Sequence, residues 1–470
     1  MPVSPAYRPD PRLPSLGPAF ADPVAAADFP QTLLRFRNDR AAATVGLETL
    51  TDAEWVAHFG RFQPLPGNID PPLAQRYHGH QFRVYNPDLG DGRGFTFAQM
   101  REVGTGRLLD LGTKGSGTTP WSRAGDGRLT LKGGVREVLA TAMLEALGVP
   151  TSKSFSLIET GEALERGDEP SPTRSAVLTR LSHGHIRFGT FQRQAFLEQP
   201  QEIVRLIDYV IETYYPELAH APDRAEALLT AVVERAGTLA AAWMAGGFVH
   251  GVLNTDNMNI TGESFDYGPY RFLPRNDPNF VAAYFDQQGL YSFGRQPEAV
   301  FWNLQNLGGC LAMVSEQQPL VDALNGFADA YRGGLAAAML KRLGLKSRGR
   351  ELDAGLVNAA FTALAAGGER LRWEPFFFDW FCGDVGRAMA SPRGDIYGSQ
   401  PFADFRRRVA ETEPERPGRL LAPYFTRTEP EELLIDEIEA IWAAIAAEDD
   451  WTAFHEKLAR IEAARKAWDL

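Results

Sequence analysis

The chain has 470 residues, 44% of them hydrophobic and 23% charged, which is ordinary for a globular protein and ample for a large core. Its net charge of −12 argues against bulk binding to DNA or RNA, so nucleic acid is not an expected partner. The two cysteines, Cys310 and Cys382, do not make a disulfide framework, and we expect buried thiols in a reducing compartment.

The N-terminal segment 1–20 contains no continuous apolar run of the kind found in secretory signals. No uninterrupted apolar stretch is long enough to cross a bilayer. We therefore expect a cytoplasmic protein that does not bind membranes, and the expected form is a monomer.

The N-terminal part shows weak helical and extended signals. Residues 1 to about 30 are rich in proline and alanine and predict an extended arm on the surface. Thr51 precedes a helical pattern that contains Trp55 and predicts a capped helix. Residues 71–82 are interpreted as a second short helix.

The next part reads as a β-rich unit with one helix. Alternation over 95–100 and an extended run over 107–114 predict a hairpin. Apolar residues at helical spacing predict a helix over 132–147, ended by Gly148 and Pro150. Short strands are expected at 154–159 and 176–181.

The remainder is mostly helical, apart from a polar loop cluster at 248–291 rich in Asp and Asn. The helices are expected at 201–214, 223–246, 297–315, 318–343, 351–366, 430–447 and 452–467. The layout predicts an α+β fold, with an N-terminal extension and a β-rich part over 1–190 and a helical part over 191–470.

Two glycine-rich loops are candidate nucleotide sites. The first is Gly90-Asp91-Gly92-Arg93-Gly94, and the second contains Asp126 and Gly127. Glycine lets the backbone approach a phosphate closely and turn its N–H groups toward it. Either loop alone is weak evidence, because most such clusters are simple turns, and neither is a Walker A loop.

Lys114 ends the second strand of the predicted hairpin, and Glu137 lies in the next helix. Such a pair can hold a lysine against the phosphates of a nucleotide, although two solvated charges are an equally simple explanation for it. Arg180 ends a predicted strand, and Arg187 follows it closely. Arginine can bind phosphate through two parallel hydrogen bonds, so both are candidate phosphate-binding residues. The alternative interpretation is that they are ordinary surface arginines.

The segment from His250 to Asn257 resembles the catalytic loop of protein kinases, and Asp266-Tyr267-Gly268 resembles their magnesium-binding motif. Oxygen ligands of Asn and Asp suit Mg²⁺ bound with a nucleotide. The glycine loop, the strand lysine, the helix glutamate, the asparagine and the aspartate also follow one another along the chain in the same order as in protein kinases. Val252, however, stands where kinases carry the general-base aspartate, and the carboxylate appears instead at Asp256.

Several stretches together resemble the selenoprotein O family of kinase-like protein adenylyltransferases. They are Tyr77–Phe82, Leu89–Gly94, Lys114–Pro120, Ser122–Arg128, His250–Asn257, Asp266–Pro269, Asp286–Gly289 and Gln296–Gln305. The match runs from about residue 30 to about 310. The resemblance implies a two-lobed protein-kinase-like fold with N- and C-terminal extensions, in which ATP binds in a flipped orientation. Residues 1–190 would include the nucleotide-binding lobe, and residues 191–470 would form the helical lobe with the catalytic and metal-binding loops.

The resemblance also implies the activity, which is transfer of AMP from ATP to Ser, Thr or Tyr hydroxyls of protein substrates. Mg²⁺ or Mn²⁺ is implied as cofactor, and some members are described as transferring UMP with manganese. Carried onto this sequence, the nucleotide-binding residues are Gly90, Gly92, Arg93, Lys114, Asp126, Gly127, Arg180 and Arg187. Glu137 would pair with the lysine, Asn257 and Asp266 would bind the metal, and Asp256 would accept the proton.

Two alternatives remain at this point. A kinase-like phosphotransferase would need a base, and Val252 cannot serve as one. A non-catalytic, pseudokinase-like nucleotide-binding module would have no need of metal ligands such as Asn257 and Asp266. Many relatives carry a selenocysteine or cysteine near the C-terminus, whereas this sequence ends in Trp468-Asp469-Leu470, so redox control is not expected.

Overall fold

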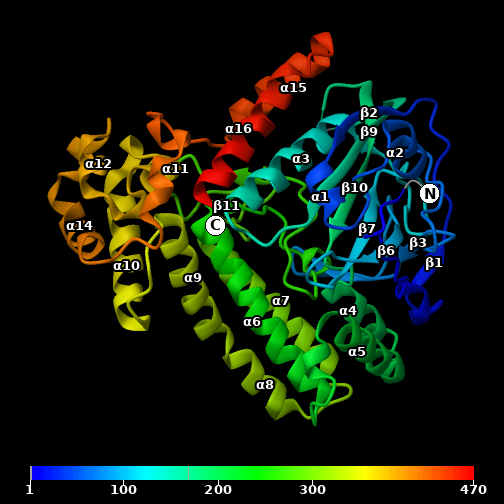
Figure 1. Ribbon diagram of the computed structural model, residues 1–470. Helices are drawn as coiled ribbons and strands as arrows, with labels where there is room; N and C mark the ends of the chain where they lie inside the picture. The colour runs from blue at the N-terminus through cyan, green and yellow to red at the C-terminus, as the bar shows by residue number, and fades with distance from the viewer. Residues whose placement is uncertain (1–2, 168) are drawn as a thin grey trace.

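The computed structural model describes residues 3–167 and 169–470, with β-strands concentrated in the N-terminal half and helices in the C-terminal half (Figure 1). This arrangement confirms the α+β class. The main sheet is antiparallel, in the order β1-β3-β6-β7-β10-β9-β2, and β8 also pairs with β10. Its strands are β1 (Ala21–Pro23), β2 (Leu33–Arg37), β3 (Leu73–Gln75), β6 (Thr96–Arg101), β7 (Leu108–Lys114), β8 (Leu129–Thr130), β9 (Lys153–Leu164) and β10 (Thr173–Ser182).

The register of the central strands sets up the site. In the β7–β10 pair, Leu178 lies opposite Lys114 and Arg180 lies opposite Gly112. Directly paired residues, and residues two apart on one strand, share a face of a sheet. Lys114 and Arg180 therefore project from the same face.

Three helices accompany the sheet, namely α1 (Asp39–Ala43), α2 (Asp52–Phe59) and α3 (Leu131–Ala146). Thr51 caps α2 in a reciprocal capping box with Glu54, as the sequence predicted. Thr130 caps α3 by accepting a hydrogen bond from the Gly133 amide. The apolar stripe of α3 is buried, so this helix presents Glu137 from a fixed position.

Helices make up most of the chain after β10, and two short strand pairs lie outside the main sheet. The pairs are β4 (Gly79–Gln81) with β5 (Val84–Asn86), and β11 (Phe248–Val249) with β12 (Arg271–Phe272). The helices are α4 (Phe188–Phe196), α5 (Pro200–Tyr214), α6 (Arg224–Ala245), α7 (Gln296–Leu311), α8 (Gln317–Asn325), α9 (Phe327–Leu343), α10 (Arg350–Gly367), α11 (Trp373–Asp379), α12 (Val385–Ala390), α13 (Gly394–Tyr397), α14 (Ala403–Ala410), α15 (Ile435–Glu448) and α16 (Thr452–Trp468).

Buried apolar residues form a core that joins the two halves. One cluster contains Leu139 of α3, Trp243 of α6 and Ile461 of α16. A second cluster lies among α9 to α14, and a third lies between α2 and the sheet. The C-terminal helices α15 and α16 lie beside α3, as the red and cyan ribbons show (Figure 1). Cys310 and Cys382 are both buried, as expected.

Several expected elements are different in the structure. The prediction of a short helix over 71–82 is wrong. This segment instead forms β3, which pairs with β1 and β6, and then enters β4. The prediction of an extended N-terminal arm on the surface is also wrong in part, because Leu13, Leu16 and Phe20 are buried and β1 extends the sheet. The helix over 318–343 is divided at Gly326, where α8 ends and α9 begins.

Helix α6 is long and apolar enough, by length and composition, to cross a membrane. Two thirds of its most apolar window (67%) is buried inside the structure, and core helices of soluble proteins pass the same test. Glu234 and Arg235 interrupt its apolar sequence.

Candidate active site

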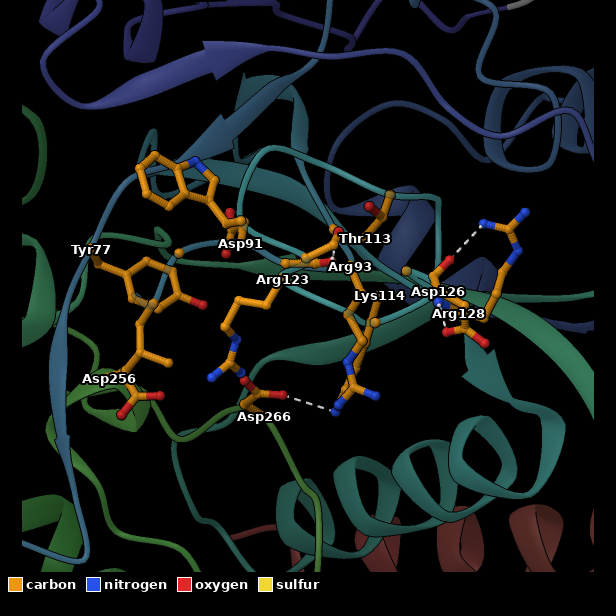
Figure 2. Close-up of a pocket in the computed structure, with 18 of the residues that line it drawn as sticks. Tyr77, Asp91, Arg93, Thr113, Lys114, Arg123, Asp126, Arg128, Asp256 and Asp266 are labelled. Carbon is orange, nitrogen blue, oxygen red and sulfur yellow. Dashed lines mark hydrogen bonds and ion pairs between the residues drawn. The ribbon is translucent and has the colours of Figure 1, made fainter. Parts of the chain in front are cut away.

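A cavity of about 650 Å³ lies between the sheet and the loops that precede α7. Figure 2 shows Lys114, Asp256 and Asp266 facing this space. Its lining includes all eight residues that the sequence proposes to bind nucleotide, namely Gly90, Gly92, Arg93, Lys114, Asp126, Gly127, Arg180 and Arg187. Asp256 and Asp266 line it as well. Residues from Gly90 to Asp266 therefore converge on one cavity.

Three cations meet the Asp266 carboxylate. The Lys114 ammonium lies 2.8 Å from Oδ1, and guanidinium nitrogens of Arg180 and Arg187 lie 3.4 Å from Oδ1 and Oδ2. Lys114 also forms a buried ion pair with Glu137, which the sequence predicted as its partner. The site therefore concentrates Lys and Arg side chains, whose charges and N–H groups are suited to bind phosphate.

Asp266 is ionised in this surrounding. Burial by itself raises the pKa of the carboxyl, but Lys114, Arg180 and Arg187 outweigh burial and hold the pKa well below its usual range. The Asp266 backbone has φ of 64°, in the left-handed region, which Asp tolerates better than most residues. The conformation turns the carboxylate toward the cations.

Arg187 precedes α4 and connects several parts of the site. It is buried, and its guanidinium donates to the Asp256 carbonyl oxygen at 2.8 Å and lies 3.3 Å from the Asp91 carboxylate. The same group lies over the Tyr77 ring at 4.5 Å and the Phe265 ring at 4.8 Å. Arg187 thereby fixes the backbone that carries Asp256.

Asp256 lies in a single 3-10 turn, Thr255–Asn257, and is buried. Its Oδ1 has no hydrogen-bond partner within the described part of the chain. Burial raises the pKa of this carboxyl to about 6, against the opposing effect of Arg187. Such a group is ionised near neutral pH and has one oxygen free to accept a proton.

Asn257 and His250 organise the loop around Asp256. The Asn257 side-chain nitrogen donates to the Val252 carbonyl at 2.9 Å, which leaves its amide oxygen available to a cation. The ring of buried His250 contacts the Phe265 carbonyl at 3.1 Å, next to Asp266. Asn257 itself is not among the residues that line the cavity. An amide oxygen and one or two carboxylates form a hard-oxygen donor set that fits Mg²⁺ completed by nucleotide phosphates.

The first glycine loop is held by the segment that follows β7. Thr119 donates to the Asp91 carbonyl at 2.6 Å, and the Ser122 hydroxyl donates to the Gly92 carbonyl. A Cβ at Gly90 would lie 2.4 Å from the Trp121 ring, and one at Gly92 would lie 2.8 Å from the Trp121 carbonyl. The glycines are therefore needed for close packing against this segment.

The second loop lies at the rim. Asp126 pairs with Arg166 at 2.8 Å and is partly exposed, and Gly127 has φ of 69° with no room for a side chain. Arg93 is exposed on the opposite loop. Glu137 lies behind Lys114 and does not line this cavity.

Three further residues contact Arg187 or the first glycine loop, and no sequence pattern predicted a role for them. Asp91 pairs with Arg187, Tyr77 stacks on it, and Trp121 packs on the glycine loop. Tyr77 and Asp91 lie inside stretches that carried the family resemblance, and Trp121 lies between two of them. Their contacts join residues far apart in sequence, so no local pattern assigned them a role.

Comparisons with known proteins identify the family of the chain. The sequence profile of a family described as "Protein adenylyltransferase SelO" matches residues 6–462. A Synechocystis protein called "Protein nucleotidyltransferase YdiU" is 46% identical, over 96% of this chain and 97% of its own length. Proteins with that description from Gloeobacter violaceus and Vibrio cholerae are 47% and 38% identical, over 96% and 75% of this chain and 94% and 71% of their own lengths. The chain therefore belongs to the SelO protein adenylyltransferase family and is a nucleotidyltransferase.

Proposed function

We propose that this enzyme transfers AMP from ATP to Ser, Thr or Tyr hydroxyls of target proteins. The observation that carries the proposal is the meeting of Lys114, Arg180 and Arg187 at Asp266, in the cavity that Asp256 also lines. The cations suit a triphosphate, and Asp256 supplies a base where a kinase base is replaced by Val252.

The family implies a kinase-like fold, and we extend the proposal to two lobes that meet near residue 190. In this arrangement residues 1–190 supply the nucleotide-binding loops, and residues 191–470 supply the catalytic and metal-binding loops. The glycine loops at Gly90–Arg93 and Asp126–Gly127 would contact the nucleotide. Lys114, held by Glu137, would contact its phosphates together with Arg180 and Arg187.

The reaction is a displacement at the α-phosphorus. The target hydroxyl oxygen bonds to that phosphorus, the bond to the bridging oxygen of pyrophosphate breaks, and the hydroxyl proton passes to Oδ1 of Asp256. Lys114, Arg180 and Arg187 stabilise the charge that develops on the phosphates. Arg187 also holds the Asp256 backbone through its carbonyl, which keeps the base in position.

A Mg²⁺ or Mn²⁺ ion bound by Asn257 and Asp266 would neutralise charge on the α-phosphate and the leaving pyrophosphate. In the structure both Asp266 oxygens face cationic side chains, so binding of a nucleotide would re-pair those side chains with phosphate. UMP transfer with manganese is a second activity of the same site. We further propose that the enzyme acts as a cytoplasmic monomer.

The decisive experiment uses ATP labelled on either the α- or the γ-phosphate, with Mg²⁺ or Mn²⁺ and a mixture of protein acceptors. We expect α-label on protein with the unmodified enzyme and none when EDTA removes the metal. Asp266→Ala should abolish the labelling, because it removes the carboxylate on which the cations and metal converge. Asp322→Ala, on the exposed surface of α8, is the matched control and should label normally.

Each other result has a defined meaning. Protein labelled only by the γ-phosphate would make the enzyme a kinase. No labelling by either form, with ATP binding intact, would favour a nucleotide-binding module. Equal labelling by Asp266→Ala would remove this cavity as the site.

A further inference from the structure

A second cavity of about 460 Å³ adjoins the nucleotide cavity. The two share Arg93, Lys114, Arg128 and Arg166, so they form one continuous depression. The remaining walls of the second cavity come from the first turn of α3, the segment 267–271 after Asp266, and the loop 282–285. We call this second cavity the basic groove. Of the residues that line it, the transfer chemistry proposed above uses Arg93, Lys114 and Glu137.

The basic groove is rich in positive charge although the protein has a net charge of −12. Its lining carboxylates among the described residues are Glu137, which binds Lys114, and Glu169. Its other cationic lining residues are Arg93, Arg128, Lys132, Arg136, Arg166 and Arg271. Such a concentration in an acidic protein indicates a surface that attracts negative charge.

The cationic side chains of the basic groove differ in whether a carboxylate pairs with them. Arg128, Lys132 and Arg166 form ion pairs with Glu162, Glu439 and Asp126. Across residues 3–167 and 169–470, no ion pair engages Arg93, Arg136 or Arg271. These three arginines have positive charge available to a partner.

Arg136 and Arg271 are held in place by neutral groups. The Arg136 guanidinium lies over the Tyr270 ring at 5.3 Å, and Arg271 donates to the Tyr270 carbonyl at 2.8 Å. The Nε atom of Arg136 is buried and has no hydrogen-bond partner within the described residues. Burial, and then the nearby Arg136, lowers the pKa of Arg271, while Glu439 opposes that shift. The two guanidinium groups are thus fixed side by side without an acidic partner.

Aromatic side chains also line the basic groove. Tyr284 is 81% exposed and Phe285 is 47% exposed, and both line the groove. Phe285 packs on Phe82 with ring centroids 5.7 Å apart, which anchors this loop. A small inorganic anion would leave these rings in water, whereas a polypeptide can cover them.

We propose that the basic groove docks an acidic segment of the polypeptide that is to be modified. Arg136 and Arg271 would pair with its carboxylates, and Tyr284 and Phe285 would cover apolar side chains beside them. The groove opens into the cavity that Asp256 lines, so a chain held there presents a neighbouring hydroxyl to the reacting phosphate. This inference rests on the proposed function, and it names the class of protein substrate.

The test uses two fluorescent peptides of equal length with the same central Tyr and Ser, one flanked by Glu and the other by Gln. Binding is measured by anisotropy at low and high salt, and α-label transfer gives KM for peptide and for ATP. We expect the Glu peptide to bind about tenfold tighter at low salt, with the difference reduced by salt. The double variant Arg136→Gln/Arg271→Gln should lose this preference without changing the KM for ATP.

The matched control is Arg332→Gln/Lys341→Gln, which removes the same charge from the exposed face of α9. It should keep the preference for the Glu peptide. Equal binding of both peptides by the unmodified enzyme would overturn the inference. So would a groove variant that raises the KM for ATP or weakens pyrophosphate inhibition as much as it weakens peptide binding, because the groove would then hold phosphate. Failure of α-label transfer to any acceptor contradicts the proposed function instead, while anisotropy still decides the docking.

Discussion

At the scale of single residues, the site depends on how closely other atoms approach Asp256. A Cβ added at Gly79 would lie 2.9 Å from Oδ1 of Asp256 and 3.0 Å from its Cβ. A side chain at position 79 therefore fits only if the carboxylate of Asp256 moves. Gly79 therefore helps to position the carboxylate of Asp256, which is the base in the proposed reaction.

We predict that Gly79→Ala lowers kcat for protein labelling by about 10- to 100-fold, because a displacement of the base near 1 Å has that effect. The Kd for ATP should stay unchanged, as should that of Asp256→Asn, which serves as the reference for a lost base. Gly309→Ala on the exposed side of α7, where a Cβ meets nothing within 4 Å, is the control. Labelling at the normal rate by Gly79→Ala would place the reacting hydroxyl away from Asp256.

The sequence predicted the residue types of the site better than their contacts. Lys114 with Glu137 was predicted as a pair, and the structure shows it. The contact of Arg187 with Asp91 spans 96 positions in the chain, so it depends on tertiary structure and left no periodic signal. The roles in nucleotide and metal binding stay predictions for the experiments above.

At the scale of elements, the β4–β5 hairpin holds the loop that contains Asp256. The His80 amide donates to the Thr255 hydroxyl at 2.7 Å, and that hydroxyl donates to Gln192 of α4 at 2.5 Å. The Phe82 amide donates to the side chain of Asn254 at 3.1 Å. Three segments that are separate in sequence are thus joined at one buried hydroxyl.

We predict that Thr255→Val destabilises the fold by about 1–3 kcal/mol, because it leaves the His80 amide and the Gln192 oxygen buried without partners. The same change should lower kcat, since the turn that carries Asp256 loses its anchor. Thr255→Ser keeps the hydroxyl and should retain most of both properties. Chemical unfolding and initial labelling rates measure the two effects. A variant as stable and active as the parent would show that the hairpin is held by its backbone alone.

Prediction of elements succeeded where local signals were strong. The capped α2, the β6–β7 hairpin, α3, α5, α6 and α16 lie where the sequence placed them, within one or two residues at most ends. The segment 71–82 was assigned to a helix, yet it forms strands because β1 and β6 offer it partners. Helix α4 was missed, although it carries Gln192 and begins directly after Arg187. Its position is set by packing and by the Arg187 contacts.

At the scale of the whole molecule, the C-terminal helices pack against the N-terminal half and brace it. Ile461 of α16 and Leu139 of α3 belong to one buried cluster, and Lys132 of α3 pairs with Glu439 of α15 at 2.7 Å. Phe454 of α16 is fully buried and meets the Phe36 ring of β2 edge to face. Because α3 carries Glu137, which pairs with Lys114, the brace is connected to the side of the cavity where we propose that phosphate binds.

We predict that Phe454→Ala weakens ATP binding as well as stability, while an equally buried phenylalanine elsewhere affects stability alone. Each truncation of a fully buried Phe should cost about 3–5 kcal/mol in unfolding free energy. The control is Phe405→Ala in α14, which is also fully buried but lies in the separate cluster among α9 to α14.

The measurement is ATP Kd by calorimetry at a temperature well below the unfolding midpoint of both variants. Phe454→Ala should raise Kd about fivefold or more, which corresponds to a coupling of about 1 kcal/mol between the brace and the site. Loosening of α16 lets α3 move, and Glu137 then no longer holds Lys114 against the phosphates. Phe405→Ala should bind ATP normally. If both variants bind ATP as the parent does, the C-terminal helices serve stability only, and α3 keeps its position through its packing on the sheet.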